Sequence, residues 1–183
     1  FTDIVNIGIG GSDLGPHMVY TALKGQFNGP KLHYLSNIDA HQWTALSKTL
    51  NPETTLFLVA SKTFTTIETL TNAQTAKDWL IQKLPGGEKA VTHHFVALST
   101  NNKAAQDFGI EQTRIFPFGD YVGGRFSLWS SIGLSLWIGL GPDAMDALFD
   151  GAYAMDCHFL KSPIEGNIVV IMALTGLWHA SGL

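Results

Sequence analysis

The chain has 183 residues, of which 45% are hydrophobic and 14% charged, and its formal net charge is −4. This composition predicts a globular protein with a sizeable core, and the low charge fraction indicates a surface that is partly covered by other protein. Because the chain has no basic run, we expect no nucleic-acid partner. The single cysteine, Cys157, excludes an internal disulfide and favours a reducing, cytoplasmic compartment. No apolar run has the length of a membrane span, and the first residues lack a signal-peptide pattern, so we expect no membrane partner.

Short apolar runs alternate with stretches of helical periodicity through the first two thirds of the chain. The predicted strands are 4–9, 32–35, 56–60, 94–99 and 113–116, and the predicted helices are 14–23, 40–48, 67–80 and 102–109. Asp39 and Asn102 are candidate caps for the second and fourth of these helices. The alternation predicts an α/β fold, a three-layer doubly wound sandwich whose five-stranded parallel sheet has the order 2-1-3-4-5. Ligands of such sheets bind beyond the carboxyl ends of the strands, where the strand order reverses.

The character of the sequence changes after Pro117. Three further helices are predicted, at 126–140, 144–159 and 167–178. The last is apolar nearly all round, which is typical of a helix buried on more than one side. Its partner is expected either inside this chain or in sequence outside it. We expect one domain over 1–183, with a sheet core at about 4–116 and a helical C-terminal part at about 126–180. Both ends lie close to predicted elements, so we expect a piece excised from a longer chain.

The segment Ser61-Lys-Thr-Phe-Thr-Thr66 joins the buried strand 56–60 to a helix. It places four hydroxyls and one ammonium at a helix N-terminus, where unpaired N–H groups and a partial positive charge favour anions. The pattern predicts a phosphate site. The alternative is that Ser61, Thr65 and Thr66 merely cap the helix, although a cap uses only one hydroxyl.

A glycine-rich turn, Gly8 to Gly15, follows the first predicted strand. Asp13 stands where the dinucleotide fingerprint requires its third glycine, so a nicotinamide dehydrogenase, with Asp39 as the ribose-binding acid, is only the third interpretation. The turn is not a P-loop, because no G-K-[ST] follows. The glycines predict a close approach of the backbone to a smaller polar ligand, with Ser12 donating a hydrogen bond. The alternative is a tight turn without a ligand.

Arg125 follows two glycines and precedes an apolar helix. This context predicts a cation held in a fixed place, and the alternative is a salt bridge to a carboxylate such as Asp120. The seven histidines have no metal-like spacing, Cys157 has no partner motif, and no Ser-His-Asp signature is present. We therefore expect neither a metal nor a cofactor.

Four segments in this order resemble the phosphoglucose isomerase family. They are Ile7-Gly-Ile-Gly-Gly-Ser-Asp-Leu-Gly-Pro16, Ser61-Lys-Thr-Phe-Thr-Thr66, Val122-Gly-Gly-Arg-Phe-Ser-Leu128 and the tail from Pro163 to Trp178. The resemblance extends over essentially the whole chain. One departure is Gly119, where an aromatic residue is more usual in the family.

The resemblance implies a sugar-isomerase (SIS), flavodoxin-like domain, the first of two in a longer homodimeric enzyme of glycolysis and gluconeogenesis. The implied reaction interconverts glucose 6-phosphate and fructose 6-phosphate. The implied roles are phosphate binding by Ser61, Lys62, Thr63 and Thr66, lining of the site by Gly11 and Ser12, and support of the enediolate by Arg125 beside Gly124.

By the same resemblance, the catalytic Glu and the ring-opening His and Lys lie downstream of this chain. Glu53, Glu68 and Glu165 do not stand in the matching context, so none of them is assigned as the base. We therefore expect the isolated chain to be inactive or nearly so. The alternative from another class is a non-catalytic SIS module that senses a sugar phosphate.

Overall fold

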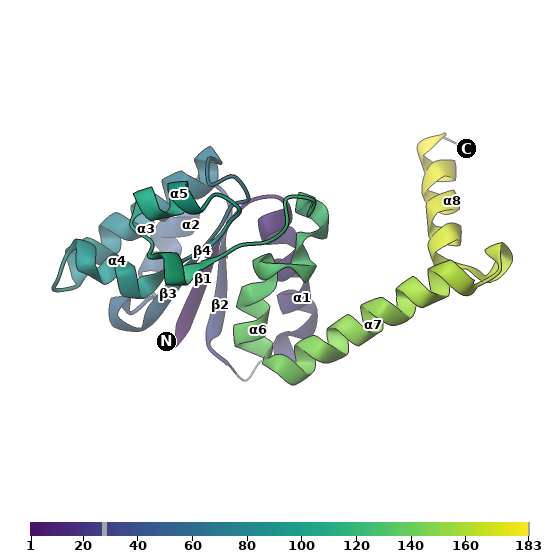
Figure 1. Ribbon diagram of the computed structural model, residues 1–183, viewed down its shortest axis with the longest axis horizontal. Helices are drawn as coiled ribbons and strands as arrows, with labels where there is room; N and C mark the ends of the chain where they lie inside the picture. Colours follow the sequence, from purple (N-terminus) through teal and green to yellow (C-terminus); the bar gives the residue numbers. More distant parts are fainter. Residues whose placement is uncertain (27–28, 183) are drawn as a thin grey trace. The chain divides into compact units, whose positions relative to one another are not determined.

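The computed structural model describes residues 1–26 and 29–182, and its first compact unit, Phe1–Gly141, is built around one parallel sheet (Figure 1). The strands are β1 (Asp3–Ile7), β2 (Lys31–Leu35), β3 (Thr55–Ala60), β4 (Phe95–Leu98) and β5 (Ile115–Phe116). All neighbours are parallel, in the order β2-β1-β3-β4-β5. The structure therefore confirms the predicted α/β fold, the five-stranded parallel sheet and its strand order.

Helices cover both faces of this sheet (Figure 1). One layer consists of α2 (Ala40–Ser47), α3 (Ile67–Lys83), α4 (Glu88–His94) and α5 (Asn102–Phe108), and the other of α1 (Gly11–Leu23) and α6 (Leu134–Leu140). Successive residues of a strand point to opposite faces, so Val5, Phe57 and Phe95 pack in one core and Ile4 and Leu58 in the other. The central strand β3 is buried along its whole length, as its uninterrupted apolar run predicts.

Two predicted local signals are confirmed at helix ends. The Asp39 carboxylate accepts a hydrogen bond from the His41 N–H at 2.8 Å and caps α2. Gly109 ends α5 in the left-handed conformation, with φ 108°. The cap of α5, however, is Asn101 and not the predicted Asn102, because the Oδ1 of Asn101 accepts from the Ala104 N–H at 3.1 Å.

The prediction of one continuous helix at 126–140 is wrong. Two 3₁₀ segments, η4 (Gly124–Trp129) and η5 (Ser131–Gly133), precede α6. Between them Ser130 has extended backbone, and its hydroxyl accepts from the Ile132 N–H at 3.3 Å. A Cβ on Gly133 would lie 2.5 Å from the Leu128 carbonyl oxygen, so this tight corner depends on a glycine.

Helix α4 has no counterpart among the predicted helices, and β5 is shorter than the predicted strand 113–116. Helix α4 occupies residues 88–93, for which no element is predicted, and His94, which is predicted to begin a strand. Gly87, with φ 54°, lets the chain reverse into this helix, and the fully buried Val91 anchors it. Strand β5 has two residues, because the segment before it forms the 3₁₀ turn η3 (Gln112–Arg114).

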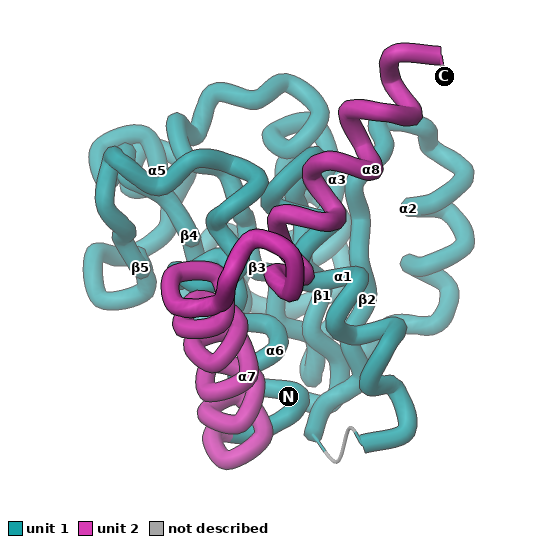
Figure 2. Tube along the Cα trace, turned by 90° about the vertical axis from the view of Figure 1, so that its right-hand side faces the viewer, with its two compact units in different colours: residues 1–141 teal, residues 142–183 magenta. Residues whose placement is uncertain are grey.

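The second compact unit, Pro142–Leu183, contains α7 (Pro142–Lys161), η6 (Ile164–Gly166) and α8 (Ile168–Ala180) (Figure 2). Asn167 joins its two helices: its Oδ1 accepts from the Val170 N–H at 3.3 Å and its Nδ2 donates to the Phe159 carbonyl at 2.7 Å. Of the two expectations for α8, burial inside this chain is not observed, because Met172 and Leu177 are more than two thirds exposed. Among the described residues, no helix combines the length and apolarity needed to span a membrane.

Candidate functional site

The loops that follow β1 and β3 meet at the carboxyl edge of the sheet, where the strand order reverses. Ile7 pairs with Val59 at the ends of these two strands. A Cβ on Gly8 would lie 3.0 Å from the Ala60 carbonyl oxygen, so the glycine-rich turn and the loop after β3 begin side by side. This is the position at which open α/β sheets bind ligands.

The loop from Ser61 to Thr66 presents its hydroxyls at the start of α3. The Ser61 and Thr66 hydroxyl oxygens lie 3.3 Å apart, and those of Thr63 and Thr65 lie 2.7 Å apart. Thr66 occupies the N-cap position, yet no side chain caps the helix by a hydrogen bond. The capping alternative is therefore not observed. The N-terminus of a 17-residue helix instead stands beside a group of hydroxyls, an arrangement suited to an anion.

Hydrogen bonds from the end of β4 hold this loop in shape. The Lys62 carbonyl accepts from the Thr100 N–H at 3.0 Å, the Thr100 hydroxyl at 2.8 Å and the Ser99 hydroxyl at 3.0 Å. The Asn101 Nδ2 donates to the Thr63 carbonyl at 3.0 Å. Sequence reasoning missed these supporting residues, although the polar run Ser99-Thr100-Asn101 directly after a buried strand was a usable signal.

Phe64 also shapes the loop. Of the residues that the structure describes, it is the non-glycine residue with positive φ, at 53°, and its side chain is 3% exposed. Its ring packs edge-on against Phe108 with the centroids 5.9 Å apart. A bulky residue adopts this backbone region only where its surroundings compensate for the strain, and such strain is concentrated at functional sites.

The backbone of the glycine-rich turn lies close to the segment that carries Arg125. A Cβ on Gly11 would lie 2.0 Å from the Gly124 carbonyl oxygen, so the turn packs directly on the segment that carries Arg125. The Ser12 hydroxyl has no hydrogen-bond partner among residues 1–26 and 29–182. The predicted site residues Gly11, Ser12 and Gly124 thus lie together.

Arg125 extends from η4 as an exposed cation. The Ser127 hydroxyl donates to the Gly124 carbonyl at 2.6 Å and lies 3.3 Å from the Gly11 carbonyl, which fixes the backbone before the arginine. The guanidinium lies 5.4 Å from the centroid of the Phe126 ring. No carboxylate of the described residues is within ion-pair distance of Arg125, so the predicted alternative, a salt bridge to Asp120, is not observed.

The Lys62 ammonium points to the same segment. It donates to the Val122 carbonyl at 3.2 Å and also to the Asp120 carbonyl. The loop of hydroxyls after β3 and the loop before Arg125 are thereby joined by one side chain.

The two acids of the nicotinamide interpretation have other roles. Asp13 is 6% exposed; burial raises the pKa of its carboxyl, while His17, 3.8 Å away, and the Ser36 hydroxyl act in the opposite direction. Asp39 caps α2, and its hydrogen bonds from His41 lower its pKa. Among the described residues, no group of three or more His, Cys, Asp or Glu side chains is arranged to hold a metal ion.

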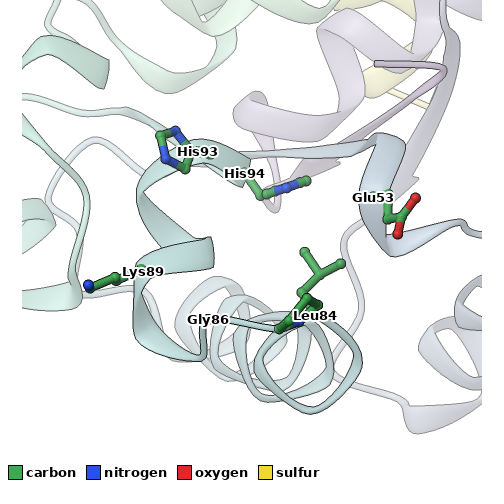
Figure 3. A pocket seen from close by; sticks show the side chains of 7 residues that line it. Glu53, Leu84, Gly86, Lys89, His93 and His94 are labelled. Atoms are coloured by element: carbon green, nitrogen blue, oxygen red, sulfur yellow. The ribbon is translucent and has the colours of Figure 1, made fainter.

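A cavity of about 300 Å³ lies at the opposite, amino-terminal edge of the sheet (Figure 3). Its lining consists of Glu53, Leu84, Pro85, Gly86, Lys89, His93 and His94. Glu53 precedes β3 and His94 precedes β4, and none of the predicted site residues takes part. This cavity is separate from the candidate site.

The fold and the loops define a doubly wound α/β protein with a candidate anion site at its strand-order reversal. The model of the phosphoglucose isomerase family matches residues 1–183, and the chain belongs to this family. A glucose-6-phosphate isomerase from Chlamydia trachomatis is similar in structure, with a TM-score of 0.86 and 31% identity over 98% of this chain and 34% of that chain. A hypothetical protein from Thermus thermophilus is also similar, with a TM-score of 0.80 and 32% identity over 97% of this chain and 42% of that chain. The chain thus spans less than half the length of either.

Proposed function

We propose that this chain is the phosphate-binding part of an enzyme that interconverts glucose 6-phosphate and fructose 6-phosphate. The observation that carries the proposal is the group of hydroxyls at the uncapped N-terminus of α3, joined through Lys62 to the loop of Arg125. Membership of the phosphoglucose isomerase family and the similarity to a glucose-6-phosphate isomerase support it.

In this proposal the loop after β3 binds the phosphate of the sugar. The proposed contacts are the hydroxyls of Ser61, Thr63, Thr66 and Ser12, with Gly11 and Gly124 forming the wall. The positive charge of Lys62 lies in the same loop and favours an anion there, while its ammonium donates to the Asp120 and Val122 carbonyls. Hydrogen bonds to a charged group contribute about 1.5–3 kcal/mol each, so a few of them hold a phosphate firmly. These phosphate contacts lie away from the reacting carbons and serve to position the sugar.

In this proposal Arg125 stabilises the negative charge that develops during the reaction. Isomerisation moves a proton between C1 and C2 of the open-chain sugar, and negative charge develops on the oxygens of the enediolate. A guanidinium stays protonated near neutral pH, so Arg125 stabilises this charge and exchanges no proton. The base is proposed to be a Glu outside this chain, which leaves the isolated chain without activity.

The proposal keeps the homodimer, the cytoplasmic location and the absence of a cofactor that the sequence analysis expects. The non-catalytic sensing module is the weaker candidate. Arg125 pairs with no carboxylate of the described residues, and a module that only binds a sugar phosphate gives this arginine no role. Protein made from the complete coding sequence would separate the two, since an isomerase converts fructose 6-phosphate and a sensor only binds it.

Calorimetric titration of the chain tests the phosphate site directly. Fructose 6-phosphate should bind, inorganic phosphate should compete, and fructose should not bind. Thr66→Val should weaken binding at least tenfold, about the worth of one hydrogen bond to a charged group. Thr71→Val, on the exposed side of the same helix, is the control and should leave the affinity unchanged. Equal binding of fructose and fructose 6-phosphate would contradict the proposal.

A further inference from the structure

The segment 117–123 connects β5 to η4 and has no helix or strand. Its internal hydrogen bond runs from the Val122 N–H to the Gly119 carbonyl at 2.9 Å. Within the described part of the chain, one hydrogen bond joins this segment to the adjacent η4, from the Phe126 N–H to the Gly123 carbonyl, and those that tie it to elements distant in sequence are the ones from the Lys62 ammonium. Tyr121 is 93% exposed, so packing adds little at the tip of the segment.

Hydrogen bonds hold the backbone of Lys62 in place. Its carbonyl accepts three hydrogen bonds from Ser99 and Thr100 at the end of β4. Its side chain then reaches the carbonyls of Asp120 and Val122, which lie shortly before Arg125. An ammonium that donates to carbonyls makes charge-assisted hydrogen bonds, which are about twice as strong as neutral ones.

We infer that Lys62 is a positioning residue: its ammonium fastens the segment 117–123 to the loop after β3 and thereby places Arg125 over the proposed site. This inference rests on the proposed function for what Arg125 does, but the fastening is a property of the chain itself. The loop after β3 then has two functions. Its hydroxyls and the α3 N-terminus contact the phosphate, and the Lys62 side chain positions Arg125.

Hydrogen exchange tests the fastening without any ligand. The reporters are the amides of Val122 and Phe126, which donate to the Gly119 and Gly123 carbonyls at 2.9 and 3.0 Å. In Lys62→Met both should exchange at least tenfold faster, the factor equivalent to one charge-assisted hydrogen bond. The control Lys103→Met removes an exposed ammonium that pairs with Asp107 on α5 and should leave both rates unchanged. Unchanged rates in Lys62→Met, or unprotected amides in the wild-type chain, would overturn the inference.

Kinetics of the protein made from the complete coding sequence test what the fastening does. Lys62→Met should lower kcat at least tenfold with a small change in KM, and Lys62→Arg should restore most of the rate, since its guanidinium can also donate to both carbonyls. A raised KM with an unchanged kcat would overturn the inference and make the ammonium a phosphate contact. If the wild-type protein converts no sugar phosphate, the proposed function fails, and the exchange rates still decide the fastening.

Discussion

The backbone of Gly11 lies so close to that of Gly124 that a Cβ on Gly11 would stand 2.0 Å from the Gly124 carbonyl oxygen. These glycines are 113 positions apart, since 124 − 11 = 113, and belong to two of the three segments that form the candidate site. The glycine-rich turn therefore serves contact between loops, and the approach to a small ligand that its sequence predicts remains a prediction.

Gly11→Ala should displace the loop of Arg125 and destabilise the fold by about 1–3 kcal/mol, as overpacking does elsewhere. Neither backbone can yield as a flexible side chain would, so the loops must move apart. Denaturant unfolding measures the loss. The control is Gly151→Ala on α7, where no atom lies within 4 Å of the added Cβ and the change should be neutral or slightly stabilising. Equal stability of both variants would show that the contact is not tight.

Phe64→Ala should lower the free energy of unfolding by about 3–5 kcal/mol, because a buried ring is lost. It should also weaken binding of inorganic phosphate, since the loop loses its anchor against Phe108. Phe159→Ala, at a half-exposed ring in the second unit, is the control and should cost much less. A small cost at Phe64, with phosphate binding retained, would mean that Phe64 does not shape the loop.

Asp13 should make the fold less stable as the pH rises. Its folded pKa is raised by burial, so the folded state binds more protons than the unfolded state from about the ordinary value of 3.8 up to the folded pKa. Stability falls across this window and stays lower above it. Asp13→Asn should therefore gain stability relative to wild type at neutral pH and not at pH 3. Urea unfolding at a series of pH values measures this difference, and a constant difference would contradict the role of burial.

Arg125→Gln should leave the fold intact and remove activity. The side chain is exposed and has no carboxylate partner among the described residues, so the free energy of unfolding should change by less than about 0.5 kcal/mol. In protein made from the complete coding sequence, kcat should fall by about 10²–10³-fold, as for loss of one group that stabilises developing charge. Arg114→Gln, at the other arginine of the chain, should keep full activity. A KM effect alone would assign Arg125 to binding.

Some elements were predictable because their signals are local. The apolar run of β3, the Asp39 cap and the end of α5 at Gly109 depend on nearest neighbours, and each was found where the sequence indicates. The break at Ser130 inside the predicted helix 126–140 was missed, because a serine cap in an apolar stretch is a weak signal beside the surrounding periodicity.

By itself the sequence determined the alternating strands and helices, the parallel class of the sheet and the hydroxyl-rich loop at a helix N-terminus. These follow from periodicity, from turn residues and from the handedness of parallel connections. Only the tertiary structure decided that Gly11 meets Gly124 and that Lys62 reaches Val122, 60 residues away. Such contacts depend on how separate segments pack in space, and the residues of one segment carry no signal for the partner they will meet.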